Sequence, residues 1–195
     1  MPDGLKLTPT GQAVNVEAAL AYAIAGDAAR AESMAQDLNK RFPLDTQVQS
    51  LWLPAIHAQV ALDRKNPSAA IESLQAAVPI ELGQIVFAIN ISCLYPTYIR
   101  GEAYLAAGQV KAADAEFQKI LDHNGIVWNC WTGSLAHLGV ARANAMVAKS
   151  AQGADADIAR TRALAAYTQF LTPWKDADPD IPVLKQAKAE YGKLQ

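Results

Sequence analysis

The side chains that could carry catalytic chemistry in this chain are few. They are three histidines and two cysteines: His57, His123, His137, Cys93 and Cys130. No two histidines pair as HxxxH or HExxH, the spacings that place zinc ligands on one face of a helix. His123 and Cys130 could act as base and nucleophile, with Asp122 orienting the imidazole. Their spacing matches no known motif, so a small hydrolase with an unexpected site near His123 and Cys130 remains only an alternative.

The two cysteines are too few for a disulfide framework or a zinc site. We expect Cys93 and Cys130 to be small buried residues, because free cysteine is among the most buried residue types. A single bridge between them stays open if the chain works outside the cytoplasm.

No other pattern in the sequence indicates catalysis or metal binding. The acidic group Asp176, Asp178 and Asp180 lacks the glycine and the distant glutamate of a calcium-binding EF-hand loop. A turn followed by a helix cap explains it more simply. The chain also lacks the Gly-x-Ser-x-Gly elbow of serine hydrolases. We therefore expect no catalytic residue, no metal and no cofactor.

Composition narrows the class of protein further. The 195 residues are 51% hydrophobic and 18% charged, with a net charge of −2. A chain with this composition can form a hydrophobic core. Because it has no stretch rich in lysine and arginine, we do not expect it to bind nucleic acid. No stretch approaches the ~20 apolar residues of a membrane span, and the first residues show no signal peptide. We expect no membrane insertion and a soluble, cytoplasmic protein.

A sequence pattern typical of paired helices recurs four times along the chain, and residues 95–123 show it most clearly. Gly101, Tyr104 and Gly108 mark one helix and its turn, and Ala113, Phe117 and Ile120 mark the inner face of the next. The four hairpins are predicted at about 12–43, 46–78, 95–123 and 131–172, followed by a capping helix at 183–193. Asp27 and Asn66 are predicted to cap the second helices of the first two hairpins.

This sequence pattern resembles the tetratricopeptide (TPR) repeat, in which each helical hairpin buries its apolar face only by stacking on its neighbours. The resemblance implies a single all-α, right-handed TPR-like solenoid over residues 1–195. Gly26 and Gly108 lie farther apart than two ideal repeats of about 34 residues each. The excess predicts an insert at 79–94. Its apolar part, Ile85–Ile91, is interpreted as an extra helix or an ordered loop rather than a strand.

Longer blocks of the sequence resemble a narrower family. The stretches LYPTYIRGEAYLAAG and WKDADPDIPVLKQAKAEYGKLQ look like the C-terminal TPR region of certain bacterial eukaryotic-like serine/threonine protein kinases. The kinase signatures themselves are absent, so no kinase activity is implied. The resemblance instead implies a kinase-associated sensor or scaffold region. A fragment of a membrane-anchored kinase could lie outside the cytoplasm.

The TPR resemblance also implies where a partner would bind. In TPR proteins the first helix of each hairpin lines a concave groove that takes up a peptide. The positions that line it correspond here to Trp52, Gln59, Tyr95, Tyr98, Glu102 and Asn144. We therefore expect a non-catalytic scaffold that binds a protein or peptide segment through aromatic and polar anchors. Two further alternatives are a self-associating structural module and a sensor for a small ligand near Trp128 and Trp131.

Overall fold

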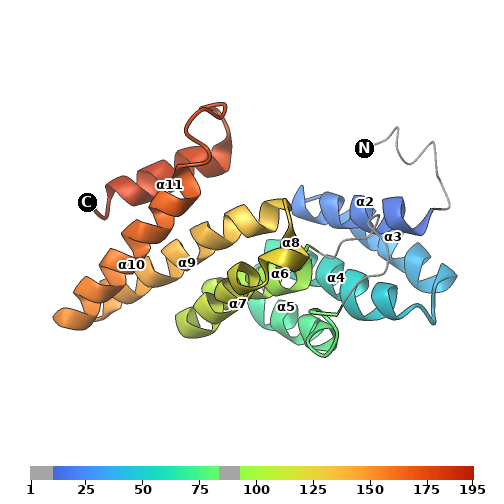
Figure 1. Ribbon diagram of the computed structural model, residues 1–195. Coiled ribbons are helices and arrows are strands. Elements are labelled where there is room, and N and C mark those ends of the chain that lie inside the picture. The colour runs from blue at the N-terminus through green and yellow to red at the C-terminus, as the bar shows by residue number, and fades with distance from the viewer. Residues whose placement is uncertain (1–10, 84–92) are drawn as a thin grey trace.

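The structure is a computed structural model that describes residues 11–83 and 93–195. Over these residues the chain is helical and contains no β-strand, which confirms the predicted all-α class (Figure 1). The elements in chain order are α2 (Gln12–Ile24), α3 (Ala28–Arg41), η1 (Val48–Trp52, a π-helical turn), α4 (Leu53–Asp63), α5 (Pro67–Ser73), η2 (Leu74–Ala77), α6 (Tyr95–Ala106), α7 (Val110–Asp122), α8 (Asn124–Val127), α9 (Trp131–Ser150), α10 (Ala154–Leu171) and α11 (Pro182–Gly192).

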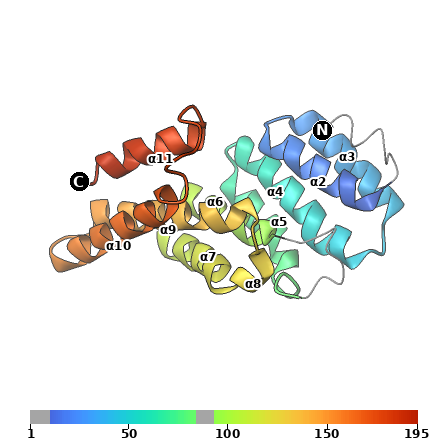
Figure 2. The same ribbon diagram turned by 45° about the horizontal axis from the view of Figure 1, so that its top comes forward.

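The helices pair in chain order. α2 packs on α3, α4 on α5, α6 on α7 and α9 on α10, so that four helical hairpins follow one another. Each hairpin then contacts the next one, through α2 and α4, through α4 and α6, and through α7 and α9. The row runs from α2 and α3 at one end of the molecule to α10 and α11 at the other (Figures 1 and 2). Most long-range packing is therefore between neighbours in the sequence.

Local signals set the hairpin turns where the sequence places them. Gly26 and Gly108 end the first helices of their hairpins with φ of 80° and 71°, a left-handed conformation that glycine adopts without steric cost. The Asp27 side chain accepts a hydrogen bond from the amide of Arg30, and Asn66 accepts one from the amide of Ala69. Both predicted helix caps are thus confirmed.

Phe117 fills the junction between the third and fourth hairpins. Its ring is fully buried and lies against two glycines, Gly101 on α6 and Gly139 on α9. A Cβ atom added to either glycine would lie 2.7 Å or 2.5 Å from ring atoms of Phe117. The two glycines are therefore required so that three helices can approach one aromatic ring.

A buried ionic cluster fastens the third hairpin to the segment that follows the second. Arg100 on α6 is 1% exposed and donates to Glu81 at 2.7 Å and to Glu116 at 2.6 Å. It also donates to the main-chain carbonyl of Leu74, while Lys119 pairs with Glu81 at 3.0 Å. Hydrogen bonds and the charges of Arg100 and Lys119 outweigh burial and lower the pKa of Glu81. The sequence analysis did not identify this cluster.

The two cysteines form a disulfide, Cys93–Cys130, with 5.7 Å between their Cα atoms. The expectation of two free buried cysteines is therefore wrong, and the bridge that the sequence left open is present. It joins the residue pair just before α6 to the residue just before α9, so it links the third and fourth hairpins. Thr132 reinforces the link, because its hydroxyl donates to the carbonyl of Cys93. The interpretation of Ile85–Ile91 lies outside the described residues.

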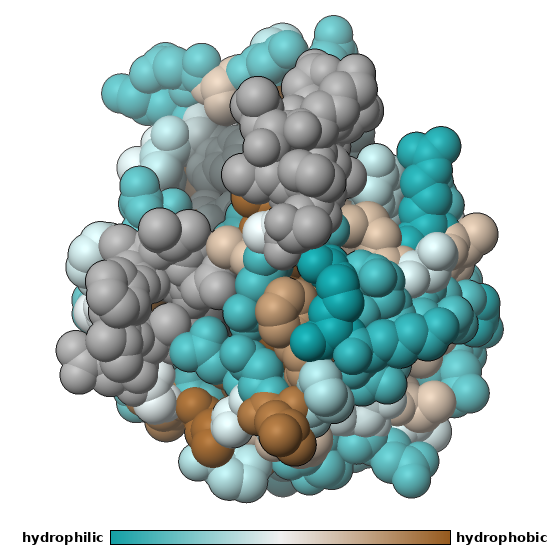
Figure 3. Space-filling view, turned by 90° about the vertical axis from the view of Figure 1, so that its right-hand side faces the viewer, coloured by the Kyte–Doolittle hydropathy of each residue, from teal (hydrophilic) through white to brown (hydrophobic). Residues whose placement is uncertain are grey.

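Polar surfaces close both ends of the row. At the C-terminal end, α11 buries Leu184 and Ala187 and leaves Lys185, Lys188 and Lys193 exposed. At the other end, the described part of the face formed around α2 to α4 is mostly hydrophilic, with small, separate hydrophobic areas (Figure 3). Polar ends of this kind disfavour end-to-end stacking of molecules.

Candidate functional site

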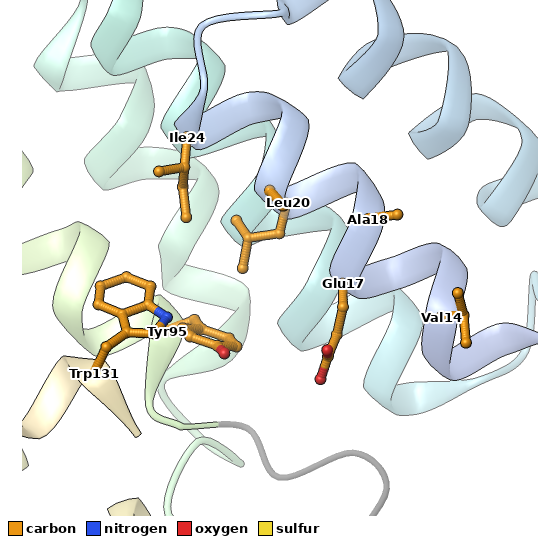
Figure 4. Close-up of a pocket in the computed structure, with 8 residues that line it drawn as sticks. Val14, Glu17, Ala18, Leu20, Ile24, Tyr95 and Trp131 are labelled. Atoms are coloured by element: carbon orange, nitrogen blue, oxygen red, sulfur yellow. The ribbon is translucent and has the colours of Figure 1, made fainter. Parts of the chain in front are cut away.

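An open cavity of about 450 Å³ lies between α2 and the first residues of α6 and α9. Its walls come from three different hairpins, so it exists only because the hairpins pack in this order. In Figure 4, Leu20 and Ile24 extend from α2 toward the rings of Tyr95 and Trp131, and Glu17 extends from the same helix on the side of Tyr95 away from Trp131. The lining residues are Val14, Glu17, Ala18, Leu20, Ala21, Ile24, Tyr95 and Trp131.

The spacing of residues along α2 explains its wall of the cavity. Val14, Glu17, Ala21 and Ile24 follow one another at steps of three and four, which places them on one helix face. The face packed against the other helices carries residues that are almost fully buried, namely Val16, Ala19, Leu20 and Ala23. Leu20 lies at the boundary and contributes to both faces. α2 is therefore apolar on two sides, and only one of them is used by the core.

The opposite wall consists of two aromatic side chains at helix starts. Tyr95 is the first residue of α6, and Trp131 is the first residue of α9. The disulfide joins the residues that lie just before them, Cys93 and Cys130. The two ring centroids are 5.5 Å apart, with planes tilted by 32°. The disulfide thus holds the two chain segments that present the rings, although the rings come from different hairpins.

The two rings belong to a longer aromatic series. Tyr95 also contacts Trp52 at 5.7 Å between centroids, and Trp131 contacts Tyr98 edge-on at 5.2 Å. Tyr98 in turn contacts Phe117 at 5.8 Å. Burial decreases along this series, from Phe117 and Trp52 in the core to Trp131, which is 39% exposed. The cavity wall is therefore supported from behind by packed aromatic rings.

Among the described residues that line this cavity, only Glu17 carries a formal charge. Its carboxylate forms no ion pair within residues 11–83 and 93–195. Desolvation raises the pKa of the Glu17 carboxyl. The pKa of Tyr95 is also raised, first by burial and then by the negative charge of Glu17. The two groups thus share one electrostatic environment.

A second cavity, of about 470 Å³, lies farther along the same side of α6, near α9 and α11. Glu102 lies one helical turn beyond Tyr98 and is hydrogen-bonded to it, and burial raises the pKa of its carboxyl. Arg142 holds Glu190 through two hydrogen bonds of 2.9 Å and 3.1 Å, and Tyr167 donates to the same carboxylate at 3.0 Å. Arg142 and Glu190 therefore form an ion pair in the wall of this cavity.

The structure divides the predicted groove residues into two sets. Tyr95, Tyr98 and Glu102 lie on one face of α6 and connect the two cavities. Trp52 is 2% exposed and contacts Tyr95 from within the core. Asn144 is 7% exposed and donates to Asp114 and to the carbonyl of Val140.

Gln59, the remaining predicted residue, lies on α4, where its amide donates to Asp63 at 3.3 Å. No residue of α2 is among the predicted groove residues. The signal was present, because Val14, Glu17, Ala21 and Ile24 recur at helical spacing beside the residues that pack in the core. Trp131 is predicted near a small-ligand site and is not among the predicted groove residues.

The structure argues against the cysteine–histidine alternative. Cys130 is bonded to Cys93, so it has no thiol to act as a nucleophile. The Nδ1 atom of His123 lies 2.7 Å from the carbonyl of Lys119, and this contact engages one ring nitrogen with the main chain. Within the described ranges, no group of three or more His, Cys, Asp or Glu side chains could hold a metal ion.

Comparisons with known proteins add no assignment. The chain matches no family model, no curated protein and no solved structure. No described helix has both the length and the apolar character needed to span a bilayer. The chemistry of the cavity therefore has to carry the functional argument.

Proposed function

We propose that this chain is a non-catalytic, TPR-like scaffold that binds an extended segment of a partner protein along the first helices of its hairpins. The observation that carries the proposal is the cavity between α2, α6 and α9, with its two aromatic rings and its partly exposed aliphatic wall. Large, rigid aromatic side chains that stay accessible are the residues that most often dominate the energy of binding to proteins.

The order of the helices supports this reading. α2, α4, α6 and α9 are the first helices of four consecutive hairpins, and α3, α5, α7 and α10 are the second ones. In a right-handed TPR-like solenoid, the first helices lie side by side along a concave surface. The described lining residues of the cavity all belong to first helices, as expected for a groove along that surface.

The apolar character of the site sets the expected strength of binding. Ile24 is 47% exposed and Trp131 is 39% exposed, so a ligand side chain can cover surface that is now in water. Burial of apolar surface contributes about 25 cal/mol per Å², and ordering of a flexible segment offsets part of this gain. We expect a moderate affinity, dominated by one or two anchor residues of the ligand.

The disulfide is relevant to the cellular compartment in which the protein is located. Structural disulfides persist in oxidising compartments and are rare in the reducing cytosol. The Cys93–Cys130 bridge therefore favours a location outside the cytoplasm over the cytoplasmic one expected from the sequence. A sensor region of a membrane-anchored bacterial kinase, as the resemblance implies, would fit such a location.

A random peptide library selected on the immobilised, oxidised chain tests the proposal. Peptides that are enriched would be synthesised, and their Kd measured by fluorescence anisotropy with the wild type and with W131A and W128A. Trp131 lines the cavity, whereas Trp128 is 69% exposed and lies outside it. We expect W131A to weaken binding about tenfold and W128A to leave it unchanged.

Two results would overturn the proposal. One is the absence of any enriched peptide, and the other is a Kd that W131A does not alter. A concentration-dependent dimer in light scattering, without uptake of peptide, would favour the self-associating alternative instead.

A further inference from the structure

The cavity combines three features that together select one kind of ligand side chain. The first is a single carboxylate, that of Glu17, without an ion-pair partner in the part of the chain that the structure describes. A partly desolvated carboxylate attracts a cation more strongly than a fully hydrated one, because the local dielectric constant is lower. Its field also reaches Tyr95 on the opposite wall.

The second feature is the pair of rings. Tyr95 and Trp131 line the same cavity as Glu17, and Tyr95 lies between Trp131 and Glu17 (Figure 4). The negative face of an aromatic ring attracts a cation within about 6 Å of its centroid, and tryptophan does so best. The rings therefore add to the attraction of the carboxylate and do not oppose it.

The third feature is the aliphatic surface of α2. Val14, Leu20 and Ile24 lie along the wall on either side of Glu17. Lysine and arginine bury their methylene stems on apolar surface and keep the charged group in a polar environment. The cavity wall is complementary to such a side chain, because its apolar surface can cover the methylene stem and its one acidic group can pair with the charged end.

We propose that this cavity takes the side chain of one lysine or arginine in the bound partner segment, with Glu17 as the counter-charge and Tyr95 and Trp131 as the ring platform. The inference rests on the proposed function, because it assumes that the occupant is part of a polypeptide. It adds the chemical class of the anchor residue.

The second cavity shows why the preference belongs to this site. There Arg142 pairs with Glu190, and Lys149 and Lys193 also line the walls, so this cavity already contains cations of the protein. At Glu17 the described protein supplies no such cation. A basic ligand therefore gains more from the first cavity than from the second.

Peptide libraries with one fixed residue test the inference. Each library has a central Arg, Lys, acetyl-lysine, norleucine or Glu and random flanking residues without cysteine. Retention of each library on the oxidised full chain is compared for the wild type, E17Q and E72Q. Glu72 is an exposed carboxylate on α5, a second helix, so E72Q makes the same charge change away from the cavity.

We expect the wild type and E72Q to retain the Arg and Lys libraries about fivefold better than the acetyl-lysine and norleucine libraries. We expect E17Q to lose this preference while its thermal unfolding stays that of the wild type, since Glu17 is exposed. Higher salt should also reduce the preference in the wild type.

The outcomes separate the two proposals. Equal retention of charged and neutral libraries, or a preference that E17Q keeps, would overturn the basic-anchor inference and leave peptide binding standing. No retention of any library would overturn the proposed function itself. Arginine amide that competes as well as the Arg library would show that the site takes a free cation, which would also refute a peptide anchor.

Discussion

The disulfide allows a quantitative prediction about stability. Cys93 and Cys130 are 37 residues apart in sequence, and the bridge closes that loop in the unfolded chain. The chain-entropy relation for a loop of this length gives about 4 kcal/mol near room temperature. A domain of this size has a total unfolding free energy of about 5–15 kcal/mol. Loss of the bridge should therefore remove a large part of the stability.

Urea unfolding followed by circular dichroism measures this effect. The oxidised chain, the chain reduced with a phosphine, and the double variant C93A/C130A would be compared at one temperature. We expect the reduced chain and the double variant to agree with each other and to be about 4 kcal/mol less stable than the oxidised chain. The double variant must not respond to the reductant, which controls for effects of the reductant itself.

The same prediction extends to the site. Because Cys93 and Cys130 directly precede the segments that present Tyr95 and Trp131, reduction should weaken peptide binding even at temperatures where the chain stays folded. A T132V variant keeps the bridge but loses the hydroxyl bond to Cys93, and we expect it to lose about 1 kcal/mol. Oxidised and reduced chains with the same stability would refute the reasoning about the loop.

The remaining predictions concern packing and charge. R100M should cost about 3–5 kcal/mol, because a buried carboxylate loses its main partner, whereas R64A removes a surface pair and should cost less than about 1 kcal/mol in the same urea titration. G139A should destabilise by about 1–3 kcal/mol through overlap with Phe117, and F117L should restore part of the loss in the double variant; a neutral G139A would contradict the packing argument. Burial raises the pKa of Glu102, so the folded chain binds more protons there than the unfolded chain and stability falls as pH rises through that raised pKa. E102Q should lack this fall when thermal unfolding is followed over a pH series, and a pH profile identical to that of the wild type would contradict the assignment.

Features that depend on local spacing could be read from the sequence. The helical class follows from apolar residues at steps of three and four, and the turns follow from Gly26, Gly108 and the caps Asp27 and Asn66. These signals act within one or two helical turns, so they do not depend on how distant segments meet. Tyr95 was predicted at the site from the TPR resemblance, and it is the first residue of α6.

Features that join distant segments could not be read in this way. Arg100 and Glu81 are separated by 19 residues, and nothing in either segment indicates that they meet. The bridge between Cys93 and Cys130 depends on how the third hairpin meets the fourth. Glu17 becomes part of the cavity only because α2 faces the starts of α6 and α9. Such meetings are set by the packing of whole hairpins, not by spacing along one helix.

The ionic cluster and the disulfide both lie next to the connection between the second and third hairpins. Hairpins in a row touch only their neighbours, so each junction depends on the contacts made there. Here the connection between the second and third hairpins is tied on both sides. Glu81 is held before it by Arg100 and Lys119, and Cys93 is bonded after it to the fourth hairpin.

The two ties also fix the site. The ionic cluster holds α6 and α7 to the end of the second hairpin, and the disulfide sets the start of α6 against the start of α9. Tyr95 and Trp131 are therefore positioned by covalent and ionic links as well as by apolar packing. α4 packs on both α2 and α6, so it positions the α2 wall of the cavity relative to these two rings. It follows that R100M and reduction of the disulfide, although both act outside the cavity, should each alter binding there.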